Sequence, residues 1–211
     1  MSQTCLLCES HNSHHYFRDK KRDYFQCNQC YLVFVPPEQH LTSEQEKAEY
    51  DKHQNSLDDQ GYLTFLARTM DPLTDLIPPP ATGMDYGCGP APALANAMNY
   101  RGYSMSTYDP YYFPDTSVLS KQYDFITCTE VIEHIAKPME ALRSLSGCLK
   151  PNGVLAIMTK RVIDQDRFAN WHYKNDPTHI AFYSDQTFLF IAEQFTFDLT
   201  FISADVIFLK S

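Results

Sequence analysis

Apolar residues alternate between strand-like and helix-like spacing through residues 82–211. Short apolar runs bounded by glycine, proline or polar residues predict strands. The predicted strands cover residues 83–86, 104–108, 125–129 and 154–159, and a closing pair covers 197–202 and 206–209. Apolar positions three and four residues apart predict helices over 91–101 and 185–194 and a helix that begins at Pro138. Strands that alternate with helices predict a parallel sheet with helices on both faces.

A helical pattern precedes these strands. Ser43, followed three residues later by Glu46, has the signature of a capping box, which predicts the start of a helix. A stripe of apolar residues at helical spacing then runs from Tyr62 to Ile77 and needs a buried partner surface. Residues 78–80 are three prolines that break the chain before the first predicted strand. We therefore expect residues 39–81 to form a helical linker that covers the domain after it.

The composition fits one principal globular domain with a small appendage. Hydrophobic residues make up 44% of the 211 residues and charged residues 20%, which allows a packed core. No apolar run reaches the ~20 residues that span a bilayer, and the first residues lack the apolar stretch of a signal peptide. We therefore expect a cytoplasmic protein with no membrane span. The formal net charge of -9 argues against a protein whose main task is to bind a nucleic-acid backbone.

Four of the seven cysteines form two Cys-x-x-Cys pairs, Cys5 with Cys8 and Cys27 with Cys30. Each pair suits a tight turn that aims two thiolates at one ion, and four thiolates complete a tetrahedral zinc site with no open position. We expect residues 1–38 to form a structural zinc ribbon, with redox chemistry or coincidence as the alternatives. The rival ligands in the spacer between the pairs are His11, His14 and His15.

A glycine turn follows the first predicted strand, in the segment Met-Asp-Tyr-Gly-Cys-Gly-Pro at residues 84–90. Gly87 and Gly89 let the backbone approach a ligand closely. Asp85, just before them, would repel a pyrophosphate but suits a cationic ligand, and the third glycine of a dinucleotide fingerprint is absent. Asp109 follows Gly89 by 20 residues, at the end of the next predicted strand, where a carboxylate can accept both hydroxyls of a ribose.

Four segments in this order resemble the class I S-adenosylmethionine-dependent methyltransferases. They are Asp-Tyr-Gly-Cys-Gly-Pro at 85–90, Asp109, Cys-Thr-Glu-Val-Ile-Glu-His at 128–134 and Leu-Lys-Pro-Asn-Gly at 149–153. The resemblance covers about residues 82–211. It implies a Rossmann-like, doubly wound α/β fold: a mostly parallel sheet of seven strands with one antiparallel closing strand, and cofactor at the strand C-terminal ends.

The resemblance also implies which residues bind S-adenosylmethionine. They are Asp85, Tyr86, Gly87, Gly89, Asp109, Pro110, Thr129 and Glu130. Ala91 departs from the family, since many members have glycine there. Residues 110–123 contain no good strand run where the family has its third strand and its adenine contact, which leaves adenine recognition open.

Glu130, Glu133 and His134 follow the fourth strand expected from the resemblance. In a helical turn, spacings of three and four residues place all three on one face, toward the cofactor's methyl group. His134 could then act as a general base on an acceptor hydroxyl, or the trio could hold a divalent cation such as magnesium. Small-molecule O-methyltransferases with a similar segment, among them quinone-pathway enzymes, support this interpretation. The structural alternative is that acids near a helix N-terminus are favourable with its dipole.

Residues 160–183 form a long polar and aromatic connection. Loops after the C-terminal ends of parallel strands face the ligand, so this connection could bind an acceptor, or it could simply pack on the sheet edge. We count His179 as a fourth candidate catalytic residue beside Glu130, Glu133 and His134. The other polar and aromatic residues of the constellation are Trp171, His172, Tyr173 and Asp176, with Tyr50 and His53 if the helical segment caps the pocket.

Methyl transfer to a small-molecule acceptor, at a hydroxyl or an activated carbon, is the function that these features favour. RNA methylation is an alternative, because zinc-bearing methyltransferases of ribosomal RNA have a similar domain order. Against it, residues 36–75 carry nine acids and only three basic residues, and the one basic cluster lies at residues 18–22. A zinc-ribbon interaction module that binds cofactor without catalysis is a third interpretation. Deoxysugar C-methyltransferases also begin with paired cysteines, but they carry a further C-terminal domain.

Overall fold

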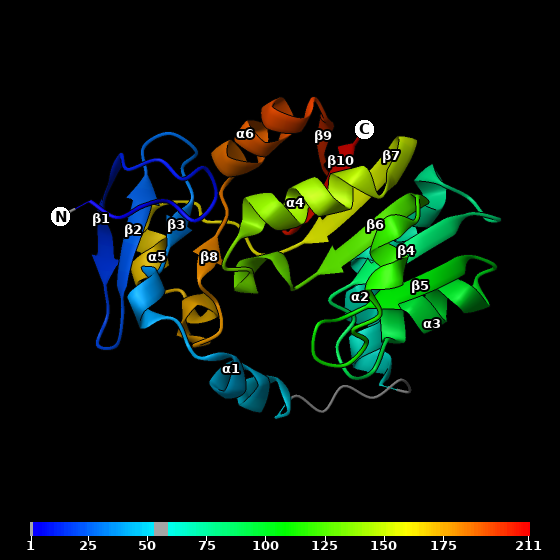
Figure 1. The fold of residues 1–211 in the computed structure, drawn as a ribbon, viewed down its shortest axis with the longest axis horizontal. Coiled ribbons are helices and arrows are strands. Elements are labelled where there is room, and N and C mark those ends of the chain that lie inside the picture. Colours follow the sequence, from blue (N-terminus) through cyan, green and yellow to red (C-terminus); the bar gives the residue numbers. More distant parts are fainter. Residues whose placement is uncertain (1, 53–58) are drawn as a thin grey trace.

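The structure is a computed structural model that describes residues 2–52 and 59–211. Two sheets lie side by side, and helix α1 (Ser43–Tyr50) lies below and between them in Figure 1. The larger sheet has the strand order β5-β4-β6-β7-β10-β9, and the smaller one has the order β1-β2-β3-β8. Because β8 belongs to the C-terminal part of the sequence, both ends of the chain build the smaller sheet.

The larger sheet is mostly parallel with an antiparallel closing strand, which confirms the predicted α/β fold class. β4 pairs in parallel with β5 and with β6, and β6 pairs in parallel with β7. β10 runs antiparallel to β7 and to β9. The strands are β4 (Thr82–Tyr86), β5 (Ser104–Tyr108), β6 (Tyr123–Thr129), β7 (Leu149–Met158), β9 (Asp198–Phe201) and β10 (Val206–Lys210).

The expectation of seven strands is wrong for the described residues, where the larger sheet has six strands. The missing strand is the one expected after the second strand of the family's order. Here residues 110–123 contain the 3-10 helix η2 (Thr116–Ser120) instead, with Asp115 capping its first turn. β5 is therefore an edge strand, and the segment after Asp109 is available to line a ligand site.

Helices cover both faces of the larger sheet, because its central strands are apolar on both sides. Along β7, Val154, Ala156 and Met158 face one core cluster, whereas Leu155 and Ile157 face the other. α2 (Gln60–Leu76) and α3 (Ala93–Tyr100) pack on the first side, and α4 (Pro138–Gly147) and α6 (Asp185–Phe195) pack on the second. Within the described ranges, no helix is long and apolar enough to cross a membrane.

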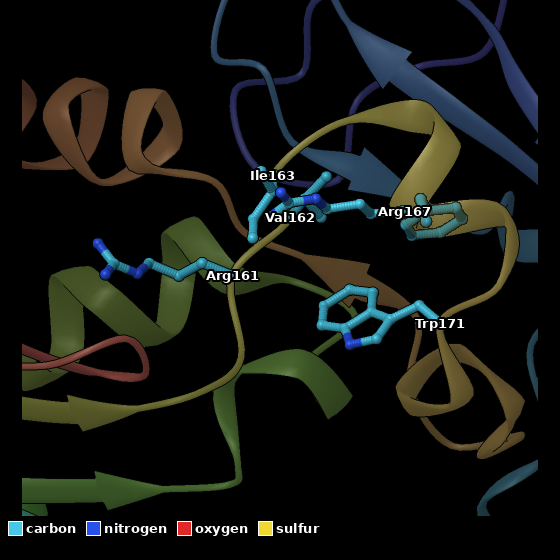
Figure 2. Close-up of a pocket in the computed structure, with 6 residues that line it drawn as sticks. Arg161, Val162, Ile163, Arg167 and Trp171 are labelled. Carbon is cyan, nitrogen blue, oxygen red and sulfur yellow. The ribbon is translucent and has the colours of Figure 1, made fainter.

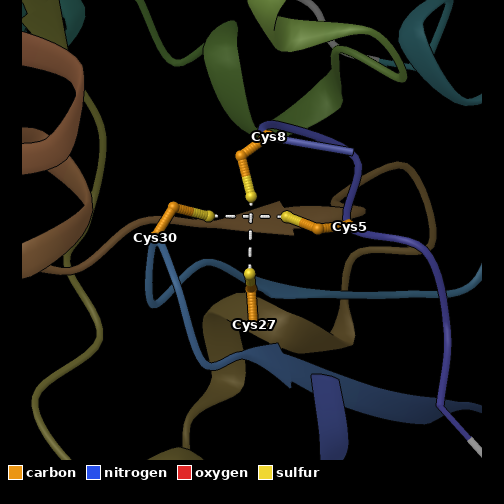
Figure 3. A group of neighbouring side chains, drawn as sticks. All are labelled: Cys5, Cys8, Cys27 and Cys30. Carbon is orange, nitrogen blue, oxygen red and sulfur yellow. Dashed lines mark hydrogen bonds between the residues drawn. The ribbon is translucent and has the colours of Figure 1, made fainter. Parts of the chain in front are cut away.

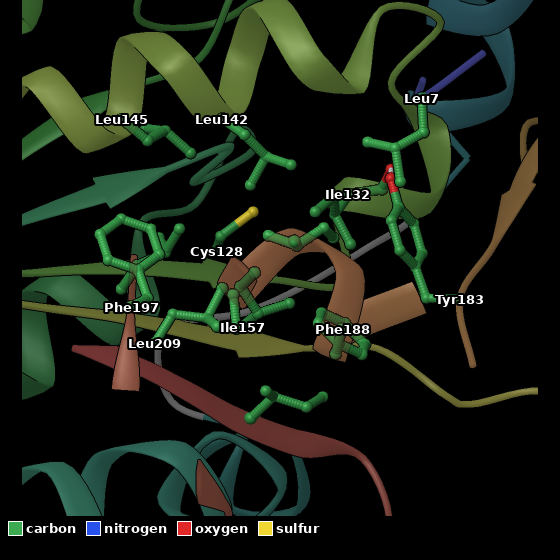
Figure 4. Packing of buried hydrophobic residues seen from close by; sticks show 14 of the residues in the cluster. Leu7, Cys128, Ile132, Leu142, Leu145, Ile157, Tyr183, Phe188, Phe197 and Leu209 are labelled. Atoms are coloured by element: carbon green, nitrogen blue, oxygen red, sulfur yellow. Dashed lines mark hydrogen bonds between the residues drawn. The ribbon is translucent and has the colours of Figure 1, made fainter. Parts of the chain in front are cut away.

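The smaller sheet shares a core with the larger one. Its strands are β1 (Ser13–Arg18), β2 (Asp23–Cys27), β3 (Val33–Phe34) and β8 (Ala181–Phe182), all paired antiparallel. Leu7, from the first cysteine turn, is fully buried and lies beside Tyr183 and near Ile132 (Figure 4). The N-terminal residues therefore pack as a continuation of the core of the larger sheet and not as a separate unit.

The helical segment before the larger sheet divides into two parts with different partners. α1 has its capping box at Thr42 and Gln45, one residue earlier than the Ser43–Glu46 box predicted from the sequence. α2 lies on one face of the sheet, where Leu66 and Met70 are buried against α3 and β7. The predicted apolar stripe is thus an ordinary sheet-covering surface, and only α1 and the first turns of α2 approach the ligand edge of the sheet.

The connection over residues 160–183 has more structure than the sequence pattern indicates. It contains α5 (Gln165–Ala169), the 3-10 helix η4 (His172–Asn175) and the strand β8. Two further 3-10 helices are η1 (Pro37–Gln39) and η3 (Ile132–His134).

Candidate functional site

A cavity of about 920 Å³ lies at the carboxyl ends of the parallel strands. Its wall includes the glycine turn after β4, the segments after β5, β6 and β7, and residues of α1 and α2. Parallel strands end at one edge of the sheet, so residues that are far apart in the sequence meet there. The volume is in the range that encloses a cofactor and a small ligand together.

The glycine turn has the geometry that the sequence predicts. Gly87 and Gly89 have φ values of +76° and +64°, in the region that glycine tolerates best. A Cβ at Gly87 would lie 2.4 Å from a methyl group of Val131, so this glycine allows close packing of the turn. A Cβ at Gly89 would have no neighbour within 4 Å. The backbone at Gly89 is therefore open for a ligand to approach.

Asp109 ties the glycine turn to the end of β5. One carboxylate oxygen accepts from the amide of Gly89 at 3.1 Å, and the other accepts from the amides of Tyr111 and Tyr112. The side chain is largely buried and lines the cavity. Each carboxylate oxygen can accept more than one hydrogen bond, so Asp109 can still accept from ribose hydroxyls in the predicted way.

Asp85 is the one predicted cofactor-binding residue that does not line the cavity. Its carboxylate accepts from the hydroxyl of Thr127 at 2.8 Å and is almost fully buried beneath the turn. Burial raises the pKa of Asp85 to about 6. Asp85 therefore supports the turn from behind, and its contact with the cofactor stays a prediction. The predicted cofactor residues that do line the cavity are Tyr86, Gly87, Gly89, Asp109, Pro110, Thr129 and Glu130.

Thr129 and Glu130 present unpaired polar atoms at the end of β6. Thr129 Oγ1 and Glu130 Oε1 are buried with no hydrogen-bond partner among the described residues. Glu130 has a φ of +52°, a left-handed conformation that is uncommon for residues other than glycine. Buried polar atoms are usually paired, so these two point to a ligand with donors. An amine and ribose hydroxyls, as in S-adenosylmethionine, would meet that need.

The predicted alignment of Glu130, Glu133 and His134 on one helical face is wrong. The 3-10 helix η3 begins only at Ile132, so Glu130 lies outside it. Glu133 is fully buried behind the cavity wall, whereas Glu130 and His134 line the cavity. A 3-10 helix has three residues per turn, so Glu133 and His134 point in different directions from those of an α-helix, and Glu130 precedes the helix.

Tyr173, from η4, joins the two glutamates. Its hydroxyl makes a short hydrogen bond to Glu133 Oε1 and lies 3.1 Å from Glu130 Oε2. Burial, and after it the neighbouring Glu130 carboxylate, raises the pKa of Glu133, and burial also raises the pKa of Glu130. Proximity of two buried carboxylates favours a state with fewer than two negative charges.

Two histidines meet on the cavity wall. The rings of His134 and His179 have centroids 4.6 Å apart, and the ring of Tyr50, from α1, contacts His134 edge-on at 5.4 Å. His134 Nδ1 lies 3.2 Å from the carbonyl oxygen of Thr178, and His179 Nδ1 lies 2.8 Å from that of Tyr173. A carbonyl only accepts, so Nδ1 carries the proton in each ring, and Nε2 is the basic nitrogen of the neutral form.

Several cavity residues have no strong signal in the sequence. Lys160, which directly follows Thr159 at the end of β7, lies 5.2 Å from the Tyr173 ring. Tyr111 and Tyr112 contribute from the segment after Asp109, and Glu46 contributes from α1. Only their position after strand ends could have indicated Lys160 and the tyrosines. Of the predicted acceptor residues, His172, Tyr173, Asp176 and His179 line the cavity, Trp171 does not, and His53 lies outside the described residues.

A second cavity, of about 140 Å³, lies near α5 and is lined by Val162, Arg167, Phe168 and Trp171 among others (Figure 2). Arg161 extends away from Arg167 and Trp171 in this view. The volume is too small for a nucleoside cofactor. The larger cavity is therefore the candidate active site.

The four paired cysteines converge at the N-terminal end (Figure 3). The Sγ atoms of Cys5 and Cys30 are 3.4 Å apart and those of Cys8 and Cys27 are 3.5 Å apart. All four lie within 4.8 Å of one another. Tetrahedral zinc with Zn–S bonds of about 2.3 Å needs sulfur–sulfur distances of about 3.8 Å, so the cluster is close to the required size. The histidines of the spacer are not part of this group.

Comparison with known proteins identifies the family. The profile described as "Methyltransferase domain" matches residues 56–200, which is more than half of the chain. The chain belongs to this family. Residues 56–200 form a methyltransferase domain, in agreement with the methyltransferase resemblance of the glycine turn and Asp109.

Curated relatives of this methyltransferase match over a limited region. The "Ubiquinone biosynthesis O-methyltransferase" of Histophilus somni is 30% identical over 82 residues, which are 37% of this chain and 34% of the relative. The protein of the same name from Haemophilus ducreyi is 30% identical over 67 residues, which are 32% of this chain and 28% of the relative. The matched part thus spans about a third of the length of these relatives.

Solved structures share the fold. The 1,6-didemethyltoxoflavin-N1-methyltransferase of Burkholderia thailandensis, solved with that compound and S-adenosylhomocysteine, superposes with a TM-score of 0.53. The alignment covers 94% of this chain and 97% of that one, at 13% identity. An O-methyltransferase family protein from the same organism has a TM-score of 0.52 at 12% identity, with 79% of this chain and 62% of that one covered.

Replacing Asp109 tests the cofactor site. If Asp109 accepts from the ribose as predicted, Asp109→Ala removes that acceptor and also the tether of the glycine turn. Loss of hydrogen bonds to a charged group should weaken S-adenosylhomocysteine binding by about 1.5–3 kcal/mol in calorimetry. Asp75→Ala, which removes an exposed aspartate on α2, is the control and should bind as the wild type does. Equal affinity of the Asp109→Ala protein would show that the ribose is bound elsewhere.

Proposed function

We propose that the enzyme methylates a hydroxyl group of a small aromatic or quinol-like molecule. The observation that carries this proposal is one cavity whose wall includes the glycine turn, Asp109 and both histidines. Tyrosine rings from α1 and from the segment after β5 also line it. Such walls suit a flat, mostly apolar ligand with few polar groups. The partial likeness to ubiquinone biosynthesis O-methyltransferases supports an oxygen acceptor.

His134 is the residue that we assign as the general base. When bound, S-adenosylmethionine supplies an electrophilic methyl group on a cationic sulfur. The acceptor oxygen forms the new bond to that methyl group as the carbon–sulfur bond breaks, and His134 Nε2 takes the hydroxyl proton. The Thr178 carbonyl fixes the tautomer by accepting from Nδ1. The remaining contribution of the enzyme is proximity and orientation of the two reactants.

A divalent cation at the same wall is the second candidate. Ligand atoms of Glu133, His134 and His179 lie within 4.8 Å of one another. This group contains His179 and lacks Glu130, which was the third member of the predicted trio. Magnesium prefers oxygen ligands and keeps several waters, whereas two imidazoles and one carboxylate suit transition metals better. The donor set therefore does not favour magnesium.

RNA is a less suitable acceptor than a small molecule. Arg22 of the basic cluster at residues 18–22 is not exposed to an RNA, because its guanidinium is buried against backbone carbonyls. The cavity wall carries Glu46, Asp109 and Glu130, and like charges repel a phosphate backbone.

His134→Ala should lower the rate of methyl transfer without weakening cofactor binding. General-base catalysis is typically worth ~10²–10⁴-fold, so the turnover rate should fall by that order while the affinity for S-adenosylhomocysteine stays unchanged. The measurement is transfer of a labelled methyl group to an acceptor found in a panel of phenols, catechols, quinols and nucleotide sugars. His15→Ala, which alters an exposed histidine of β1, is the matched control.

The same assay separates the base from the metal. If a cation is required, Glu133→Gln and His179→Ala will match the loss in His134→Ala, and a chelator will reproduce it. Full activity in His134→Ala would refute the assignment of His134 as the general base. His172 and His179 would then be the next candidates for that role.

We also propose that Cys5, Cys8, Cys27 and Cys30 hold one structural zinc ion. Four thiolates leave no coordination position for a substrate, so the ion would stabilise the fold and take no part in the chemistry. The short strands β1, β2 and β3 have little core of their own, and a metal compensates for that in small units.

Natively purified protein should contain one zinc per chain by elemental analysis. Cys27→Ser should abolish stoichiometric zinc and expose the backbone amides of β1 and β2 to hydrogen exchange, because the site loses one of its four ligands. Cys88→Ser, which changes a cysteine outside the cluster, should retain the metal. Protein that lacks zinc but shows full protection in β1 and β2 would contradict the proposal.

The division of the chain into residues 1–38, 39–81 and 82–211 remains our proposal, with α1 as the cover of the active site. Two tyrosines after β5 hold α1 over the cavity: Tyr111 donates to Glu46 and Tyr112 donates to Asp51, each at 2.7 Å. A cover of this kind excludes water from the reacting groups.

Removing both hydroxyls tests the cover. The double variant Tyr111→Phe, Tyr112→Phe should speed hydrogen exchange in α1, because both hydrogen bonds that tie the helix end and Glu46 to the segment after β5 are lost. Addition of S-adenosylhomocysteine should slow exchange in α1 of the wild type. Tyr100→Phe, at a side chain that is 96% exposed, is the control. Identical exchange in α1 in all of these samples would show that the helix is not a cover.

A further inference from the structure

Arg22 is a buried cation that no carboxylate neutralises in the described part of the chain. It lies in the turn between β1 and β2, and its side chain is only 9% exposed. Its guanidinium donates instead to four backbone carbonyls, those of Lys174, Asp176, Pro177 and His179. A planar guanidinium has five N–H donors in a fixed fork, so it can hold several carbonyls in one arrangement.

The segment that Arg22 holds is the acceptor side of the active site. Tyr173, Asp176 and His179 line the cavity, and four carbonyls of residues 174–179 accept from Arg22. His134 donates from Nδ1 to the carbonyl oxygen of Thr178, and His179 donates from Nδ1 to that of Tyr173. Loop carbonyls usually bond to water, whereas this loop closes around one side chain from the N-terminal sheet.

We propose that Arg22 is a positioning residue that makes the N-terminal sheet part of the acceptor site. The guanidinium sets the path of residues 174–179 and thereby the position of His179 and of the carbonyl that orients His134. The role of this loop in acceptor binding rests on the proposed function, but the coupling between Arg22 and the loop does not. The N-terminal cysteine cluster then affects methyl transfer through the hairpin that carries Arg22.

The test compares hydrogen exchange in Arg22→Ala and wild-type protein. Without the guanidinium, exchange in residues 174–180 should rise at least about tenfold, because the loop loses four hydrogen bonds to one charged group. Calorimetry should show unchanged affinity for S-adenosylhomocysteine, since Arg22 does not line the cavity. Arg18→Ala, on the same hairpin but exposed, is the matched control and should leave the loop protected.

Rescue separates a positioning role from a general loss of stability. Guanidinium ion at millimolar concentration, far below the molar concentrations that unfold proteins, should restore protection of the loop in Arg22→Ala, whereas methylammonium should not. Arg22→Lys should stay unprotected, because an ammonium group has three donors and no planar fork. In ¹⁵N-histidine-labelled protein, the Nδ1 proton resonance of His179 should be lost in Arg22→Ala and return with guanidinium.

Three results would overturn the proposal. Unchanged exchange in the loop of Arg22→Ala would show that Arg22 does not hold it. Equal rescue by methylammonium would show that only charge matters. Loss of protection throughout β1, β2 and β3 together with the loop would show a role in folding alone. None of these readouts requires an acceptor, so failure of this inference is distinguishable from failure to find a methyl acceptor.

Discussion

The parallel pairing of β4 with both β5 and β6 is the constraint on which the active site depends. Because the three strands run the same way, the glycine turn, Asp109 and Glu130 emerge at one edge of the sheet. The amide of Gly89 then reaches the carboxylate of Asp109, which fixes the turn and the predicted ribose acceptor relative to each other. A slip of one residue in either pairing would turn the strand-end side chains to the opposite face and separate these groups.

Burial of acidic groups around this edge has a chemical consequence. Asp85, Glu130 and Glu133 are all withdrawn from water, and burial raises the pKa of each carboxyl. A cationic cofactor beside these carboxylates would offset part of the cost of keeping them charged. The site is therefore better suited to a sulfonium than to a pyrophosphate, which agrees with the position of Asp85 before the glycines.

Local sequence signals predicted the sheet well, and the predicted glycine turn and Asp109 meet at its carboxyl edge. The β5 strand at residues 104–108 has the predicted bounds, and α4 begins at Pro138, because period-two apolar runs and proline at a helix start are local features. β7 begins at Leu149, five residues before the predicted start, since Asn152 at a φ of +63° allows the Pro-Asn-Gly segment to bend within the strand. The burial of Asp85 was less predictable, because its hydrogen bond to Thr127 on the neighbouring strand β6 is a property of the packed structure.

The acceptor side was less predictable because tertiary contacts build it. Tyr50, Arg22 and His179 lie in three distant parts of the sequence, and the β3–β8 pairing helps to bring the hairpin beside the loop. The helical interpretation of residues 130–134 failed for a related reason: the turn after β6 packs under Tyr183, whose hydroxyl donates to the carbonyl of Ile132. Neither contact has a signature in residue spacing.

A crystal structure with bound S-adenosylhomocysteine tests the joined active site most directly. We expect the ribose hydroxyls at Asp109, the amino acid moiety at the Gly87–Gly89 turn, and the sulfur on the side of the cavity that carries His134 and His179. A sulfur atom directed away from both histidines, or a ribose that does not contact Asp109, would contradict a single cavity shared by cofactor and acceptor.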